Sequence, residues 1–197
     1  MSAASVPVIA TVVEGHGEVA ALPVLLRVVA AHLGRQVVVP TPFRQPRSKL
    51  VLPSELDKAV RVVGARVNGA GGTLVLLDAD DDCPVALRGR LSSSLSAARG
   101  RVEIVVANRE FEAWFLASIT SLRGHRSVAG DASWVADPDE PRDAKKRLEQ
   151  QMVESYKETR HQPAFSARVD VDAALDRSRS FRRFVHAVKT LLSNDGG

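Results

Sequence analysis

The stretch Thr73-Leu-Val-Leu-Leu-Asp-Ala-Asp-Asp-Asp82 joins a continuous apolar run directly to a cluster of aspartates. The run over 73–77 is typical of a strand that is buried on both faces of a parallel sheet. Two β-branched runs, 8–13 and 102–107, lie on either side of it in the sequence, and a shorter one covers 36–39. Helix-like segments separate these runs. The alternation predicts an α/β fold, an open sheet of about four parallel strands flanked by helices.

The helices have recognisable starting signals, and the pattern of elements changes after about residue 120. Pro23 suits a first helical turn, so the helix expected over 18–33 begins near Ala21 or carries a kink. Ser54 is the expected N-cap of the next helix. The expected helices cover residues 18–33, 54–67, 84–98, 108–116, 142–156 and 171–192. Residues 1–120 are therefore predicted to form an α/β core, and 121–197 a helical extension packed on it as one structural unit.

Length and composition exclude several classes of protein. The 197 residues are 45% apolar and 25% charged, which is ordinary for a globular chain and excludes a collagen-like repeat, a coiled coil and a wholly disordered protein. Cys83 is the single cysteine, so we expect no disulfide framework and a reducing, cytoplasmic setting. The net charge of +4 is compatible with a nucleic-acid partner. No segment is predicted to export the chain or to span a membrane.

Acidic residues follow two of the predicted strands at the point where each strand ends. Glu14 follows the run over 8–13, and Asp78 and Asp80 follow the run over 73–77. Sites of open parallel sheets lie at this edge, and clustered carboxylates are easiest to maintain around a divalent cation such as Mg²⁺ or Mn²⁺. We expect these three carboxylates to converge within reach of one ion. Asp82 is either a further ligand or the cap of the helix that Pro84 opens.

Two more acidic residues follow the strand expected over 102–107. Glu110 and Glu112 are either ligands of a second metal ion or first-turn acids that complement the helix dipole. One of them is expected to face inward. Their neighbours Phe111 and Trp114 are expected to lie in the core rather than to stack on nucleic-acid bases.

Two groups of basic residues are candidates for contacts with phosphates. One group lies in the loop after the second expected strand, and the other lies on the polar face of the helix expected over 171–192, whose apolar face should pack on the core. The candidates are Arg44, Arg47 and Lys49 in the first group, and Arg179, Arg182 and Arg183 in the second. Lys49 either acts catalytically on a phosphate near the metal or is an ordinary surface lysine. The basic run over 145–147 is expected to be a solvated face.

These motifs together resemble a known domain. A strand that ends in Glu14-Gly15 and a buried strand that ends in Asp78-x-Asp80 are similar to the Toprim domain, which topoisomerases, bacterial primases, recombination-repair proteins and overcoming-lysogenization-defect nucleases share. The blocks Arg109-Glu-Phe-Glu-Ala-Trp-Phe-Leu116 and 178–184 most closely resemble a bacterial family of unknown function with a Toprim-like core. The resemblance implies that Glu14 is a metal ligand or general acid/base and that the two aspartates bind metal.

The leading hypothesis is a Mg²⁺- or Mn²⁺-dependent phosphoryl-transfer enzyme, most simply a nuclease that cleaves phosphodiester bonds in defence or DNA repair. The resemblance also implies an ATPase partner protein. No motif in this chain itself indicates ATP binding. One alternative is a non-catalytic binding or regulatory subunit with a Toprim-like core. Another is a metal-dependent enzyme that acts on a small phosphorylated molecule.

Overall fold

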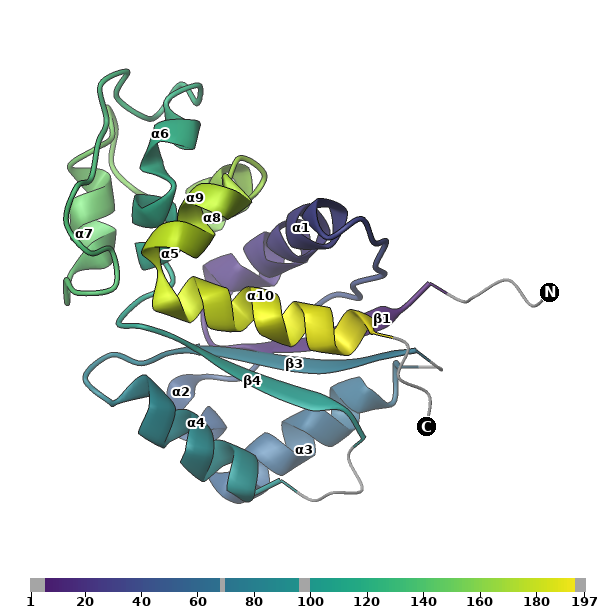
Figure 1. Cartoon of the computed structure of the whole chain (residues 1–197). Coiled ribbons are helices and arrows are strands. Elements are labelled where there is room, and N and C mark those ends of the chain that lie inside the picture. Colours follow the sequence, from purple (N-terminus) through teal and green to yellow (C-terminus); the bar gives the residue numbers. More distant parts are fainter. Residues whose placement is uncertain (1–5, 68–69, 96–99, 194–197) are drawn as a thin grey trace.

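The computed structural model describes residues 6–67, 70–95 and 100–193, and its centre is a four-stranded sheet (Figure 1). All neighbouring strands are parallel, in the order β2-β1-β3-β4. The strands are β1 (Val8–Val13), β2 (Phe43–Arg44), β3 (Gly71–Asp78) and β4 (Val102–Ala107). The α/β class and the open parallel sheet are therefore confirmed, and the strands that end near Glu14 and Asp78 are direct neighbours.

The second strand lies at a different place from the one expected over 36–39. In that segment only Val38 pairs with β1, through a single bridge to Val8, and the strand itself is Phe43–Arg44. Two prolines, Pro40 and Pro42, separate the bridge from the strand. Because proline has no backbone N–H to donate to a ladder, the pairing is interrupted between these two points.

Helices cover both faces of the sheet, so each strand contributes to two cores. α3 (Pro53–Gly64) and α4 (Pro84–Ser93) cover one face, and α1 (His16–His32) and α10 (Arg179–Leu192) cover the other (Figure 1). Alternate residues of β3 serve the two sides: Leu74 and Leu76 face α1 and α10, and Val75 and Leu77 face α3 and α4. This two-sided burial explains why the run over 73–77 is apolar without interruption.

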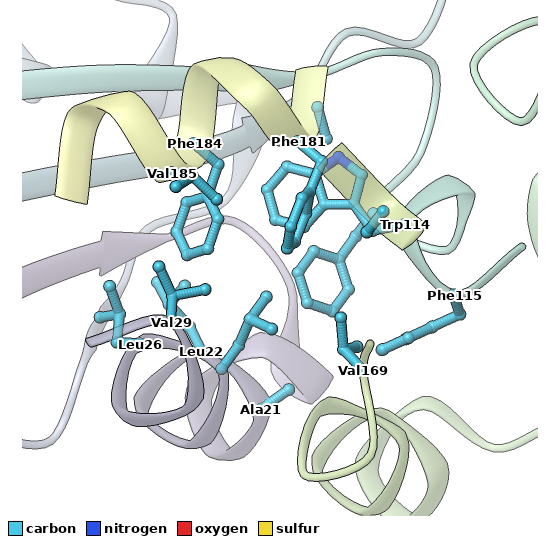
Figure 2. Packing of buried hydrophobic residues seen from close by; sticks show 14 of the residues in the cluster. Ala21, Leu22, Leu26, Val29, Trp114, Phe115, Val169, Phe181, Phe184 and Val185 are labelled. Carbon is cyan, nitrogen blue, oxygen red and sulfur yellow. The ribbon is translucent and has the colours of Figure 1, made fainter. Parts of the chain in front are cut away.

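Aromatic side chains fill the core on the α10 side (Figure 2). Phe111 and Trp114 are fully buried, which confirms that they are core residues. Trp114 stacks on Phe184 with 4.9 Å between the ring centroids and meets the edge of Phe181 at 5.4 Å. The apolar face of α10 is therefore in the core, as its periodicity predicts.

The helices at the N-terminal end of the chain begin earlier than their sequence signals indicate. α1 starts at His16 and contains Pro23 in its interior, so the start expected near Ala21 is wrong. α3 starts at Pro53, and its N-cap is Leu52 rather than Ser54. Pro53 occupies a first-turn position, where the missing N–H of proline has no intrahelical partner to lose.

The expected helix over 171–192 is two helices. α9 (Val171–Arg177) ends at Ser178, whose backbone is extended, and α10 begins at the next residue. The Ser178 hydroxyl accepts a hydrogen bond from Phe181 N at 3.0 Å and caps α10. The cap starts a new helix at this point, although the apolar residues keep their helical spacing across the break.

The other helices are shorter than expected or were not expected. The segment 108–116 is helical only in α5 (Ala113–Ala117), and 142–156 only in α7 (Ala144–Glu149). The helix expected over 84–98 ends at Ser93, and residues 96–99 lie outside the described residues. Helices without a predicted counterpart are α2 (Arg47–Leu50), α6 (Ile119–Leu122) and α8 (Glu158–Ser166). No helix in the described ranges is both long and apolar enough to cross a membrane.

Gly71→Ala is expected to destabilise the protein by about 1–3 kcal/mol. Gly71 begins β3 with φ +117°, and a Cβ atom there would lie 2.0 Å from the carbonyl oxygen of Val8. Gly89→Ala is the matched control, because Gly89 lies in α4 with open space around it and alanine favours a helix. Urea unfolding of both variants measures the difference. Equal stability of the two variants would contradict the close approach of β1 and β3.

Candidate functional site

An acidic pocket of about 230 Å³ lies where β1, β3 and β4 end. Seven carboxylate side chains line it. They are Glu14, Glu18, Asp78, Asp80, Glu110, Glu112 and Glu158. Among the described residues, Lys145 is the only cationic side chain in its lining. The pocket therefore holds many more acidic than basic side chains.

The sheet topology brings the carboxylates together. Glu14 follows Val13, which pairs with Leu76 two residues before Asp78. Asp78 in turn pairs with Ala107, the last residue of β4. Glu110 and Glu112 lie in the turn that follows β4. Glu112 is 2% exposed, so it is the acid of this pair that faces inward.

Burial is the main cause of the raised pKa values in the pocket. It raises the pKa of Glu18 to about 7, and the carboxylates of Glu112 and Glu14 act in the same direction. Burial, followed by the charges of Glu18 and Glu112, raises the pKa of Asp78 well above its usual range. Burial also raises the pKa of Glu14 and of Glu110. The folded protein therefore retains protons here at a pH where isolated carboxyls have lost them.

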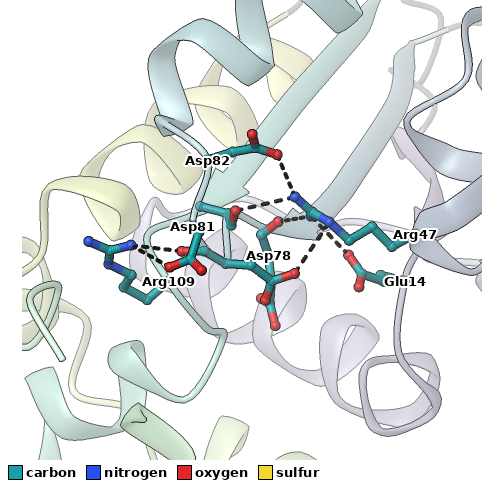
Figure 3. A network of polar contacts seen from close by, with 8 residues as sticks. Glu14, Arg47, Asp78, Asp81, Asp82 and Arg109 are labelled. Carbon is teal, nitrogen blue, oxygen red and sulfur yellow. Dashed lines mark hydrogen bonds and ion pairs between the residues drawn. The ribbon is translucent and has the colours of Figure 1, made fainter. Parts of the chain in front are cut away.

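Arg47 lies outside the lining of the pocket and pairs with several acids beside it (Figure 3). Its guanidinium lies 2.7 Å from the Asp82 carboxylate, 3.3 Å from that of Asp80 and 3.7 Å from that of Glu14. It also donates to the carbonyl oxygens of Asp78 and Ala79. One side chain thus crosses from α2 to the ends of β1 and β3.

This network explains two departures from the expected site. Asp82 lies outside the lining of the acidic pocket and does not cap α4, whose N-cap is Cys83. Asp80 has a left-handed backbone (φ 49°), and its side chain is 55% exposed and pairs with Arg47. In the described part of the chain, no three or more His, Cys, Asp or Glu side chains are grouped so that they could hold an ion. Glu14, Asp78 and Asp80 share the pocket, and the expectation that they hold one ion stays a prediction.

The inner wall of the pocket comes from the helical extension. Tyr156 Oη and Gln162 Nε2 both donate to Glu112 Oε1, at 2.9 and 3.0 Å. Gln162 Oε1 is buried and has no hydrogen-bond partner among the described residues. Gly17 permits this approach of α8 to α1, because a Cβ atom there would lie 2.2 Å from Gln162 Oε1.

The model of the family Domain of unknown function (DUF4276) matches residues 13–189. The chain belongs to this family. The expected membership of a family of unknown function is thereby confirmed. No curated protein and no solved structure matches the chain. The range matched by the DUF4276 model contains every residue that lines the acidic pocket.

The basic candidates lie outside the acidic pocket of this DUF4276 domain. Lys49 is exposed on α2, and its catalytic role and its reading as an ordinary surface lysine both stay predictions. Arg44 is exposed on β2. Arg182 donates to the carbonyl oxygens at the end of α9, and Arg183 pairs with Glu103 of β4. Their expected contacts with nucleic acid stay predictions.

Four polar side chains in the lining of the DUF4276 pocket were not predicted as site residues. Glu18 lies in the first turn of α1, where its carboxylate accepts from the backbone N–H groups of Glu14 and Gly15. An acid at this position near a helix start is the signal that could have found it. Lys145 was expected to be solvated, but its ammonium pairs with Glu158 and its backbone N–H donates to Glu110 Oε2 at 2.7 Å. Glu158 and Gln162 lie on α8, for which the sequence offered no signal near the site.

Proposed function

We propose that this DUF4276 domain is a divalent-metal-dependent phosphoryl-transfer enzyme, most simply a nuclease that cleaves phosphodiester bonds. The observation that carries the proposal is the acidic pocket at the carboxyl ends of three parallel strands. Parallel α/β sheets place their sites at this edge. A buried excess of carboxylates is costly for the folded chain unless protons or cations neutralise it.

The donors in the pocket fit Mg²⁺ or Mn²⁺. They are hard oxygen atoms, which these ions prefer. Glu14 Oε2 and Gln162 Oε1 are buried and accept no hydrogen bond from the described residues. Glu14, Asp78 and Asp80 would hold the ion. A bound ion would polarise a phosphoryl oxygen and lower the pKa of water.

Other residues of the chain are suited to proton transfer and to phosphate binding. Glu18, with its pKa near 7, can hold or release a proton at neutral pH, as a general acid or base requires. Lys145 supplies a positive charge for a phosphate in the pocket. Arg47, whose guanidinium lies beside Glu14, can bind a phosphate oxygen at this edge of the sheet. The Toprim resemblance of the Glu14-Gly15 and Asp78-x-Asp80 motifs extends the proposal to nucleic acid.

A nuclease assay tests the proposal directly. Single-stranded and duplex DNA and RNA are incubated with the protein in Mg²⁺, in Mn²⁺ or in EDTA. Asp80→Ala is expected to lower the cleavage rate by at least about 100-fold, because it removes a ligand of the ion that stabilises the transition state. Asp81→Ala is the matched control, since Asp81 pairs with Arg109 and Arg142 and does not line the pocket. The proposal fails if no substrate is cleaved in either metal, or if both variants cleave alike.

One observation favours a non-catalytic binding module as the second candidate. Arg47 already pairs with Glu14, Asp80 and Asp82, as a bound cation would. A permanent ion pair of this kind would leave a Toprim-like core that binds a partner without metal chemistry. Arg47→Ala separates the two candidates. If the domain is a metal-dependent enzyme, the variant should bind Mn²⁺ more tightly than wild type in isothermal titration calorimetry, because the arginine no longer competes with the ion. If the domain is a binding module without metal, the variant should bind no Mn²⁺.

A further inference from the structure

A second cavity, of about 350 Å³, lies at the open edge of the sheet, outside the acidic pocket. It is formed where α4 and α10, which cover opposite faces of the sheet, pass the edge strand β4 (Figure 1). Pro84, Val85 and Val106 provide an apolar surface within it. The size is in the usual range of small-molecule sites, about 300–1,000 Å³.

Three arginine side chains, Arg88, Arg179 and Arg183, line this cavity. Across the described ranges, the guanidinium groups of Arg88 and Arg179 have no hydrogen-bond or ion-pair partner. Arg183 pairs with Glu103 through Nη2, but its Nε is buried and makes no hydrogen bond with the described residues. The cavity therefore holds donors and positive charge that the protein leaves unused.

Asp139 is the one carboxylate among the described residues of the lining, and it does not cancel this charge. Asp139 is 2% exposed, and both its oxygens accept hydrogen bonds at the start of α10. The donors are the Ser178 hydroxyl at 2.8 Å and the backbone N–H and hydroxyl of Ser180, each at 3.1 Å. Asp139 is thus held in the protein framework. Arg179 also lines an adjoining pocket with Asp137 and Glu140, but no ion pair or hydrogen bond ties its guanidinium to them.

The arginine-lined cavity lies close to the acidic pocket. Asn108, which lines the cavity, directly follows Ala107, and Ala107 pairs with Asp78 of the acidic pocket. Neighbouring strands are about 4.8 Å apart. The cavity and the acidic pocket therefore adjoin at the ends of β3 and β4, where one nucleic-acid strand could contact both.

We propose that the arginine-lined cavity binds one unpaired nucleotide of the strand whose phosphodiester lies at the acidic pocket. The base lies on the apolar surface of Val85 and Val106, and the flanking phosphates pair with Arg88 and Arg179. Guanidinium groups pair with phosphates and also stack on planar rings, so the lining suits both parts of a nucleotide. A base can enter a concave site only when it is unpaired, so the cavity selects single strands. This inference rests on the proposed function, whose substrate it specifies.

Fluorescence anisotropy in EDTA tests the cavity without the metal site. The probe is a 5′-labelled single-stranded DNA tetranucleotide, and the variant is Arg88→Ala/Arg179→Ala. Because neither arginine has a partner among the residues that the structure describes, the variant should fold as wild type does, which far-UV circular dichroism checks. We expect at least tenfold weaker binding and a salt slope that is smaller by about 1.4, or about 0.7 for each lost phosphate contact. Arg90→Ala is the control, because Arg90 is exposed on the same helix and does not line the cavity.

Competition experiments identify the ligand. Unlabelled adenosine monophosphate should displace the probe, and a duplex of the same sequence should compete at least tenfold less well. The inference is overturned if the double variant binds as wild type does, if the duplex competes equally, or if an acidic peptide of matched charge competes as well as the single strand. Binding in EDTA without any cleavage in Mg²⁺ or Mn²⁺ would leave this inference standing and defeat the proposed function. Cleavage that the double variant leaves unchanged would support the proposed function and overturn this inference.

Discussion

The metal-free protein is expected to lose on the order of 3 kcal/mol of unfolding free energy between pH 5 and pH 8. Glu18 accounts for this amount, because its pKa rises from 4.5 to about 7 on folding. Between these two pKa values the folded state binds more protons than the unfolded state. The contribution of Glu18 to the unfolding free energy is therefore complete below about pH 4.5 and is lost as the pH rises through 7. The raised pKa values of Asp78, Glu14 and Glu110 act in the same direction. The lowered pKa of His125 opposes them near pH 6, through one partly exposed group.

Mg²⁺ and Asp78→Asn should change this pH dependence in distinct ways. Mg²⁺ binds only the folded state and should restore stability at pH 8, by an amount that grows with its concentration. Asp78→Asn removes one buried carboxylate, so we expect a more stable metal-free protein at pH 8 and no further stabilisation by Mg²⁺. Urea unfolding at four pH values, in EDTA and in Mg²⁺, measures both effects. A metal-free stability that is the same at pH 5 and pH 8 would contradict the uncompensated negative charge in the pocket.

Trp114→Ala is expected to destabilise the protein by about 3–5 kcal/mol. Trp114 is fully buried, packs on Phe181 and Phe184, and donates from Nε1 to the Ser180 hydroxyl at 2.9 Å. The alanine variant loses the ring contacts between α5 and α10 and leaves a cavity. Chemical denaturation followed by far-UV circular dichroism measures the loss.

Trp114→Phe is the matched control for this core position. It keeps an aromatic ring but loses the hydrogen bond to Ser180, so we expect a smaller loss of about 1–3 kcal/mol. The comparison separates ring packing from the polar contact. A loss below about 1 kcal/mol for Trp114→Ala would mean that α10 is not held to the core by this cluster.

The sequence predicts the central sheet well because its signals are local. β1, β3 and β4 are apolar or β-branched runs with clear ends, and burial on both faces keeps 73–77 apolar throughout. β2 is only two residues long and follows two prolines, so no run of residues marks it. The apolar pattern over 171–192 predicts one helix, but the structure divides it at the capping residue Ser178. The hydrogen bond from Ser178 to Asp139 stabilises this break.

The sequence predicts the part of the candidate site that lies on the strand ends. Glu14, Asp78, Asp80, Glu110 and Glu112 come together because parallel neighbouring strands end at one edge. The rest depends on how distant helices pack, which periodicity does not reveal. Gln162 reaches the pocket only because α8 packs against α1 at a glycine. The pairing of Arg47 with Asp80 is likewise a tertiary contact between α2 and the end of β3.

The late position of α8 and α10 in the chain has a consequence during synthesis. A ribosome makes β1, β3 and β4, with the carboxylates at their ends, well before it makes α8 and α10. Until then the nascent polypeptide lacks Gln162 and Glu158, and the face of β3 and β4 that α10 covers is open to solvent. A growing chain therefore carries an unfinished pocket beside an exposed apolar surface. If the finished pocket cleaves nucleic acid, translation itself delays that activity until the helical extension has emerged and folded.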